Sequence, residues 1–214
     1  MGTNSLVRIG GVCAILSVVS GIVARIFFRL GDLLTGHWFD VLSLLLVKAA
    51  ALGFYQALRE AGAVLWIAVV AFFTGAIFLL FHEFIRLGIG YELAPAIADA
   101  STATRPALEV MADTLRQTSW LAAGVGYVLI FGIGVLLFSF AILETSVVPK
   151  WIGWLGLIVV AVHVTLLTLL SGVLETIRPP WLWPVATGTA LLWMVAMGVV
   201  LLRLKEPVAP DSVA

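Results

Sequence analysis

The sequence predicts an all-α protein, a six-helix transmembrane bundle with one longer polar loop between the third and fourth helices. Hydrophobic residues make up 62% of the 214-residue chain and charged residues only 11%, and the mean hydropathy is +1.15. Soluble domains carry about 25% charged residues, so this composition indicates a chain surrounded by lipid. Six spans leave little room for a separate soluble domain, and we expect a single integral membrane domain over residues 1–214.

Six apolar stretches are each long enough to cross a bilayer, since a spanning helix needs about 20 mainly apolar residues. They lie at residues 9–28, 39–58, 63–84, 120–143, 151–174 and 181–202. The first could be mistaken for a secretory signal, but it is too long and no small-residue cleavage pattern follows before Arg25. Every tryptophan except Trp193 falls at or near a predicted span end, as indole rings favour the headgroup level. Gly31, Gly62, Pro179 and Pro180 mark breaks between spans.

An even number of spans places both termini on one side of the membrane. The numbers of Lys and Arg residues on the two sides are nearly equal, so they do not decide the orientation. The opposite face carries the long polar connection and most of the carboxylates. We therefore expect the termini to be cytoplasmic.

The long connection, residues 87–119, is the one segment large enough to hold structure outside the bundle. Arg105 and Pro106 are typical of a helix start, and Leu108, Met111 and Leu115 then share one face. This pattern fits a helix that lies in the membrane interface and equally fits an outward extension of the fourth helix. A lid over a substrate site is a third interpretation.

Small residues spaced four apart predict close helix packing, because lipid gives helices no hydrophobic reason to associate. The pairs are Gly10 with Ala14, Ser17 with Gly21, Ser20 with Ala24, and Ala122 with Gly126. The fourth span also carries several glycines, from Gly124 to Gly134, that permit a kink or a tight crossing.

Several function classes are disfavoured. Twelve Lys and Arg balance twelve Asp and Glu and form no basic face, which argues against nucleic-acid binding. The single cysteine, Cys13, cannot form an internal disulfide, and no Cys/His cluster has metal-ligand spacing. A bis-histidine haem fails because His82 and His163 differ in depth by roughly 13 Å at 1.5 Å per residue. Ser171 is too far along its helix from His163 to use it as a base.

These exclusions lead us to expect no catalytic residues, no cofactor and no metal site, and a protein that is not an enzyme. Glu83 has no second glutamate of the kind that paired-glutamate membrane proteases use, and no Gly-rich phosphate loop occurs.

Lys48 and His163 form the candidate interior polar site. Lys48 is about ten residues from either end of its span, or roughly 15 Å, which a lysine stem cannot reach across. It should therefore face the bundle interior. His163 is the only ionisable residue at comparable depth. We predict that the two share a water-filled cavity or a hydrogen-bond network, with a satisfied core histidine as the alternative interpretation of His163.

A second set of ionisable residues gathers at the opposite face from the termini and defines a candidate outer vestibule. Residues four apart share a helix face, and His37, Asp40, Glu175 and Arg178 lie at the same level. The alternative interpretation is ordinary headgroup anchors and snorkelling arginines. The vestibule residues are Arg25, Arg29, His82, Glu83 and Arg86.

Four runs of sequence carry a resemblance to a known family: residues 8–11 (RIGG), 52–58 (LGFYQAL), 148–156 (VPKWIGWLG) and 192–203. They resemble the uncharacterised six-span membrane family carried as domain of unknown function 4386. The resemblance covers most of the chain in order and implies a six-helix protein of a bacterial cell membrane. It brings no catalytic residues, and neither Lys48 nor the Arg105 region maps onto that family.

The sequence thus predicts a multi-pass protein of the plasma membrane without stating its molecular role. An accessory, sensory or structural role is one interpretation. The alternative is a small-solute or proton-coupled transporter, or a channel-like protein, that uses a polar interior around Lys48 and His163. The expected partner is the lipid bilayer, with a second copy of the chain or another membrane protein left open.

Overall fold

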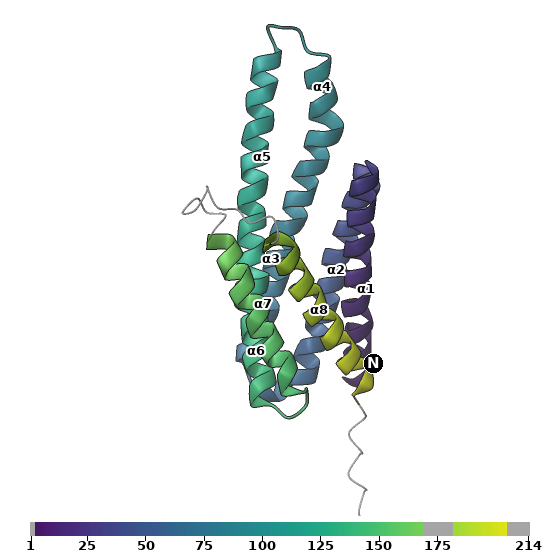
Figure 1. Cartoon of the computed structure of the whole chain (residues 1–214), viewed down its shortest axis with the longest axis vertical. Helices are drawn as coiled ribbons and strands as arrows, with labels where there is room; N and C mark the ends of the chain where they lie inside the picture. Colours follow the sequence, from purple (N-terminus) through teal and green to yellow (C-terminus); the bar gives the residue numbers. More distant parts are fainter. Residues whose placement is uncertain (1–2, 169–181, 205–214) are drawn as a thin grey trace, which may run out of the picture.

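The computed structural model describes residues 3–168 and 182–204, and these residues contain helices, turns and no strand. The helices run up and down the long axis of the molecule (Figure 1). In chain order they are α1 (Thr3–Leu30), α2 (Leu33–Leu58), η1 (Arg59–Ala61), α3 (Val64–Gly88), η2 (Ile89–Leu93), α4 (Ala94–Ala98), α5 (Arg105–Tyr127), η3 (Val128–Gly134), α6 (Val135–Glu144), α7 (Lys150–Thr168) and α8 (Leu182–Arg203).

The predicted helical bundle is confirmed. Five helical stretches among the described residues are long and apolar enough to cross a membrane, and α7 contributes a shorter apolar one. α1 begins and α8 ends at the same end of the bundle (Figure 1). The predicted span at 151–174 begins within α7, but its last residues lie outside the described ranges. The same holds for Ser171, Glu175, Arg178, Pro179 and Pro180.

The connection at residues 87–119 is almost entirely helical. α3 continues through the π-helical segment η2 into α4, and α5 returns after a turn at residues 99–104. The two arms form a hairpin that rises beyond the ends of α1 and α2 (Figure 1). Of the interpretations considered, the outward extension of the fourth helix is the one found. The predicted polar loop is limited to the turn at residues 99–104, at the tip of the hairpin. We call this end of the bundle the hairpin end.

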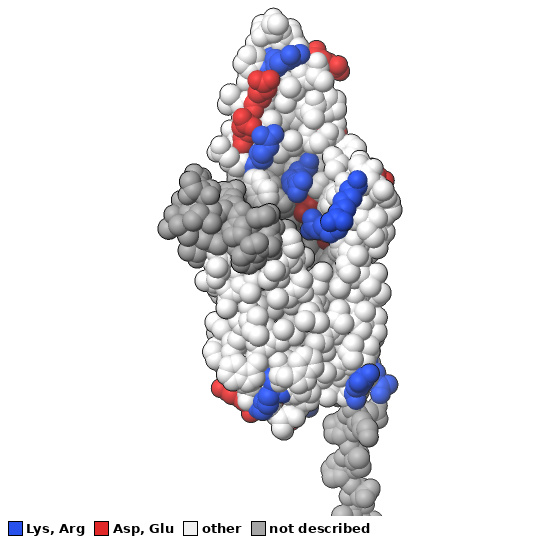
Figure 2. Space-filling view, viewed as in Figure 1, with Lys and Arg blue, Asp and Glu red and all other residues white. Residues whose placement is uncertain are grey.

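The surface is divided by charge. Charged side chains gather toward the two ends of the molecule, and the broad band between them is uncharged on the face drawn in Figure 2. Large apolar side chains point outward along the helices, including Val19, Ile26, Ile67 and Val70, which are 50–59% exposed. A continuous exposed apolar surface suits lipid and not water.

Glycines allow the helices to approach closely. Gly10 on α1 faces Gly53 on α2, and a Cβ on either would lie 2.5 Å from the Cα of the other. Gly11 faces Gly198 on α8, where a Cβ would lie 2.8 Å from the partner's carbonyl oxygen. Small residues therefore set these crossings, as expected for helices in lipid.

Asp32 caps the start of α2 and lies between two spanning segments. Its carboxylate accepts a hydrogen bond from the backbone N–H of Thr35 at 3.0 Å, and the hydrogen bonds from the side chain and backbone of Thr35 lower the pKa of Asp32. A carboxyl whose pKa is lower in the folded state contributes stability above its unfolded-state pKa and loses that contribution as the pH falls through its folded-state value.

Acidification therefore tests this cap. Between pH 6 and pH 3 we expect the melting temperature of the wild type in detergent to fall further than that of Asp32→Asn, whose amide caps the helix without titrating. Equal falls in the two proteins would contradict the assignment.

Candidate functional site

Four ionisable side chains are buried near the hairpin end. His37 and Asp40 lie on α2, His82 and Glu83 lie on α3, and each is only 3–8% exposed. The residues on α2 are three apart and therefore share a helix face. Burying such groups is costly unless each has a partner, and each of the four has one.

Glu83 lies between two imidazoles. The Nδ1–H of His37 donates to Oε2 of Glu83 in a buried hydrogen bond. The other carboxylate oxygen, Oε1, lies 3.8 Å from Nε2 of His82. The three side chains thus form a row that runs from α2 to α3.

Ser119 on α5 accommodates both neutral tautomers of His82. Its carbonyl oxygen lies 2.9 Å from Nδ1 of His82 and accepts when that nitrogen carries the proton. Its hydroxyl lies 2.7 Å from the same nitrogen and donates when the proton is on Nε2 instead. The Nε2 atom that faces Glu83 can therefore gain or lose a proton while Nδ1 keeps a hydrogen-bond partner.

Arg25 on α1 is the cation nearest to Asp40. Its Nη2 atom lies 3.4 Å from Oδ2 of Asp40, and its guanidinium carbon lies 5.6 Å from the centre of the Phe28 ring. The side chain of Arg25 is 56% exposed, whereas that of Asp40 is 11% exposed. The guanidinium therefore reaches in from the surface to a buried carboxylate.

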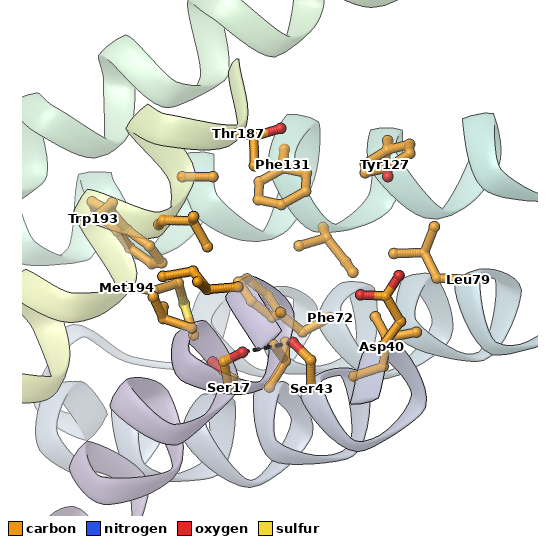
Figure 3. A pocket seen from close by; sticks show the side chains of 18 of the residues that line it. Ser17, Asp40, Ser43, Phe72, Leu79, Tyr127, Phe131, Thr187, Trp193 and Met194 are labelled. Carbon is orange, nitrogen blue, oxygen red and sulfur yellow. Dashed lines mark hydrogen bonds between the residues drawn. The ribbon is translucent and has the colours of Figure 1, made fainter. Parts of the chain in front are cut away.

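These groups lie at one end of a cavity of about 190 Å³ between α1, α2, α3, η3 and α8 (Figure 3). Arg25, Asp40, His82 and Glu83 line its polar end. In Figure 3 the carboxylate of Asp40 points across the cavity toward Tyr127. From Asp40 to Val47, which also lines the cavity, α2 rises about 10 Å at 1.5 Å per residue. The deeper wall is mostly apolar and includes Phe72, Phe131, Trp193 and Met194.

The π-helical segment η3 supplies Phe131 to this wall. Gly126, just before η3, and Gly134, its last residue, pack directly against α3, where a Cβ on Gly134 would overlap the ring of Phe72. π-helical turns often accompany functional sites because they re-aim side chains from a continuous helix. The glycine-rich fourth span thus produces a tight crossing and a helical irregularity, both of which its sequence permitted.

A second hollow of about 250 Å³ lies next to the first at the hairpin end. Asp32, His37, Arg86 and Tyr91 line it with the backbone of the α1–α2 turn. We call it the outer hollow. His37 lines the outer hollow and Glu83 lines the cavity, so their hydrogen bond stands between the two spaces.

The candidate vestibule residues are divided between these spaces. Arg25, His82 and Glu83 line the cavity, Arg86 lines the outer hollow, and Arg29 is exposed and lines neither. Sequence reasoning placed His37 and Asp40 at this level without including them in the vestibule. Their three-residue spacing at the start of α2 was the signal that could have identified them.

Among the described residues, no hydrogen bond or ring contact joins Lys48 to His163. Lys48 is half-buried on α2 between the exposed Leu45 and Leu52 and lies outside the cavity lining. His163 is buried on α7, where its Nδ1–H donates to the carbonyl of Val159 at 2.9 Å. Its ring stacks at 4.1 Å on Phe131, behind the cavity wall. This geometry is that of a satisfied core histidine, and a shared cavity with Lys48 stays a prediction.

The fold and the site together define a multi-pass helical bundle of the membrane class, with a cavity that is polar at one end. Comparison with models of known families, with curated proteins and with solved structures finds no match for this chain. The resemblance to the domain of unknown function 4386 family therefore stays a prediction. Among the described residues, no group of three or more His, Cys, Asp or Glu could hold a metal ion.

Proposed function

We propose that this protein is a membrane carrier for a small solute, with its binding site in the cavity and its entrance through the outer hollow. The observation that carries the proposal is the hydrogen bond between His37 and Glu83, which separates two hollows at the hairpin end. A carrier needs a site that can be closed from one side of the membrane by a small movement. Breaking one side-chain contact is such a movement.

The row His37, Glu83 and His82 also supports coupling of the solute to a proton. A proton can reside on either imidazole or on the carboxylate, and Ser119 satisfies His82 in both tautomers. Buried ionisable residues inside membrane bundles commonly serve proton relays. Proton transfer to Glu83 would weaken its attraction for His37 and so favour opening.

Thiol accessibility in proteoliposomes tests the carrier proposal. Cys13→Ala removes the only cysteine, and Ser43→Cys then places a thiol in the cavity. The matched control is Ser139→Cys, because Ser139 is fully buried on α6 and does not line the cavity. A membrane-impermeant methanethiosulfonate reagent is added to the outside or trapped inside in separate experiments.

A carrier exposes its site alternately to the two sides. We therefore expect Ser43→Cys to react from each side and at least about tenfold faster than Ser139→Cys, with thiol loss measured by mass spectrometry. Reaction from one side alone would contradict the carrier proposal and indicate a receptor-like pocket instead. No reaction from either side would overturn solute binding in this cavity altogether.

A further inference from the structure

The geometry points to a small organic cation, a protonated amine with an apolar body, as the solute of the cavity. This inference rests on the proposed function, since it names the solute class for the same site. Three independent properties of the lining carry it: the balance of charge, the way the polar hydrogens are used, and the aromatic wall.

The charge balance favours a cation. Two carboxylates, Asp40 and Glu83, line the cavity and are buried, against one guanidinium, that of Arg25. The Arg25 side chain is 56% exposed and can swing toward water at little cost. Neither carboxylate can leave, because each is fixed on a helix inside the bundle. An arriving ammonium group would replace Arg25 beside Asp40 and keep that charge paired.

Three polar groups of the lining already use their hydrogens inside the protein. The hydroxyl of Ser43 donates to the carbonyl of Ser17 at 2.8 Å, and the hydroxyl of Ser17 donates to the carbonyl of Ala14 at 2.7 Å. The indole N–H of Trp193 donates to the carbonyl of Ile152 at 3.2 Å. The two hydroxyl oxygens can still offer a ligand their lone pairs, and the indole can offer its ring carbons. These three groups therefore favour a hydrogen-bond donor such as ammonium over an anion, which would have to find its partners among the other polar groups of the lining, such as Arg25 and Thr187.

Aromatic rings form the wall beyond the carboxylates. Phe72, Phe131, Tyr127 and Trp193 all line the cavity, and all four are labelled in Figure 3. Aromatic faces attract cations, most strongly when water is excluded. They also accommodate an apolar body. A volume of about 190 Å³ is below the usual range of about 300–1,000 Å³ for drug-sized ligands, which limits the solute to a small amine.

Charge-matched thiol reagents test this inference on the same Ser43→Cys protein. The cationic trimethylammonium-ethyl methanethiosulfonate is compared with the anionic sulfonatoethyl reagent, and each rate is divided by its rate with free 2-mercaptoethanol. We expect a normalised preference for the cation of about tenfold or more, because a unit charge beside a partly buried carboxylate is worth at least that factor. Adding Asp40→Asn should reduce the preference severalfold, whereas the control Glu109→Gln, at an exposed position on α5, should preserve it.

Protection by small ligands gives a second measurement that needs no change at either carboxylate. Phenethylammonium should slow the modification of Ser43→Cys, whereas 2-phenylethanol and 3-phenylpropionate, which are close in size, should slow it severalfold less. Equal protection by the three compounds, or an anionic reagent that reacts as fast as the cationic one, would overturn the cation inference and leave the carrier proposal standing. If neither reagent reacts, the proposed function itself fails.

Discussion

Replacement of Glu83 by leucine is expected to destabilise the protein by about 1–3 kcal/mol, because it leaves buried polar atoms without a partner. His37 is 3% exposed and its Nδ1–H donates to Glu83. Without the carboxylate, this buried N–H loses its hydrogen-bond partner. The measurement is equilibrium unfolding of the purified protein in detergent, followed by circular dichroism.

The double variant His37→Leu, Glu83→Leu should recover most of that loss. Removing both partners of a buried pair removes the desolvation cost together with the attraction. The matched control is the exposed pair of Arg116 and Asp113 at 2.6 Å on α5, where Asp113→Ala should change stability by less than about 1 kcal/mol. A double variant that is as unstable as the sum of the two single variants would show that the two side chains act independently, and the contact could not then serve as a gate.

The outline of the fold could be predicted because hydropathy measures what a helix needs to cross lipid. The predicted spans at 9–28 and 39–58, for example, lie within α1 and α2. The sequence could not decide between the hairpin and a helix lying in the membrane interface, because the apolar face of residues 108–115 suits either a membrane interface or a neighbouring helix. In the structure that segment belongs to α5, which packs along α3.

The candidate site was only partly predictable, and Lys48 shows why. Its depth follows from its position in the span, but the direction in which it points does not. In a soluble helix the polar face marks the side toward water. In lipid, the residues that face outward, such as Leu45 and Leu52, are as apolar as Val47, which faces the cavity. The hydropathy pattern therefore does not show which side of α2 faces the bundle interior. In the structure Lys48 is half-buried, Leu45 and Leu52 on either side of it are exposed, and it does not line the cavity.

The residues at the polar end of the cavity were easier to find, because several ionisable side chains at one level of a bundle are themselves unusual. Arg25, His82 and Glu83 come from two spans, α1 and α3, that line the same end of the cavity. The hydrogen bond from Ser43 to the carbonyl of Ser17 could not be predicted from the sequence, since it depends on how α1 and α2 cross.

That crossing depends on Gly10, and Gly10→Ala is expected to lower the free energy of unfolding by about 1–3 kcal/mol. The added methyl group would lie 2.5 Å from the Cα of Gly53, where both surfaces are backbone and neither can rotate away. Gly124→Ala on α5 is the matched control, since nothing lies within 4 Å of its new methyl group. There the same change should stabilise the protein by up to about 1 kcal/mol through helix propensity.

The opposite signs of these two substitutions distinguish packing from propensity, with both measured by thermal unfolding in detergent. Gly53→Ala should resemble Gly10→Ala, and the two combined should fall short of additivity, because the first methyl group already separates the helices. Wider separation of α1 and α2 would also lengthen the 2.8 Å hydrogen bond from Ser43 to Ser17 and release a hydroxyl hydrogen into the cavity. A Gly10→Ala protein that is stabilised like Gly124→Ala would mean that the two backbones are not in contact, and the cavity would lose the crossing that shapes it.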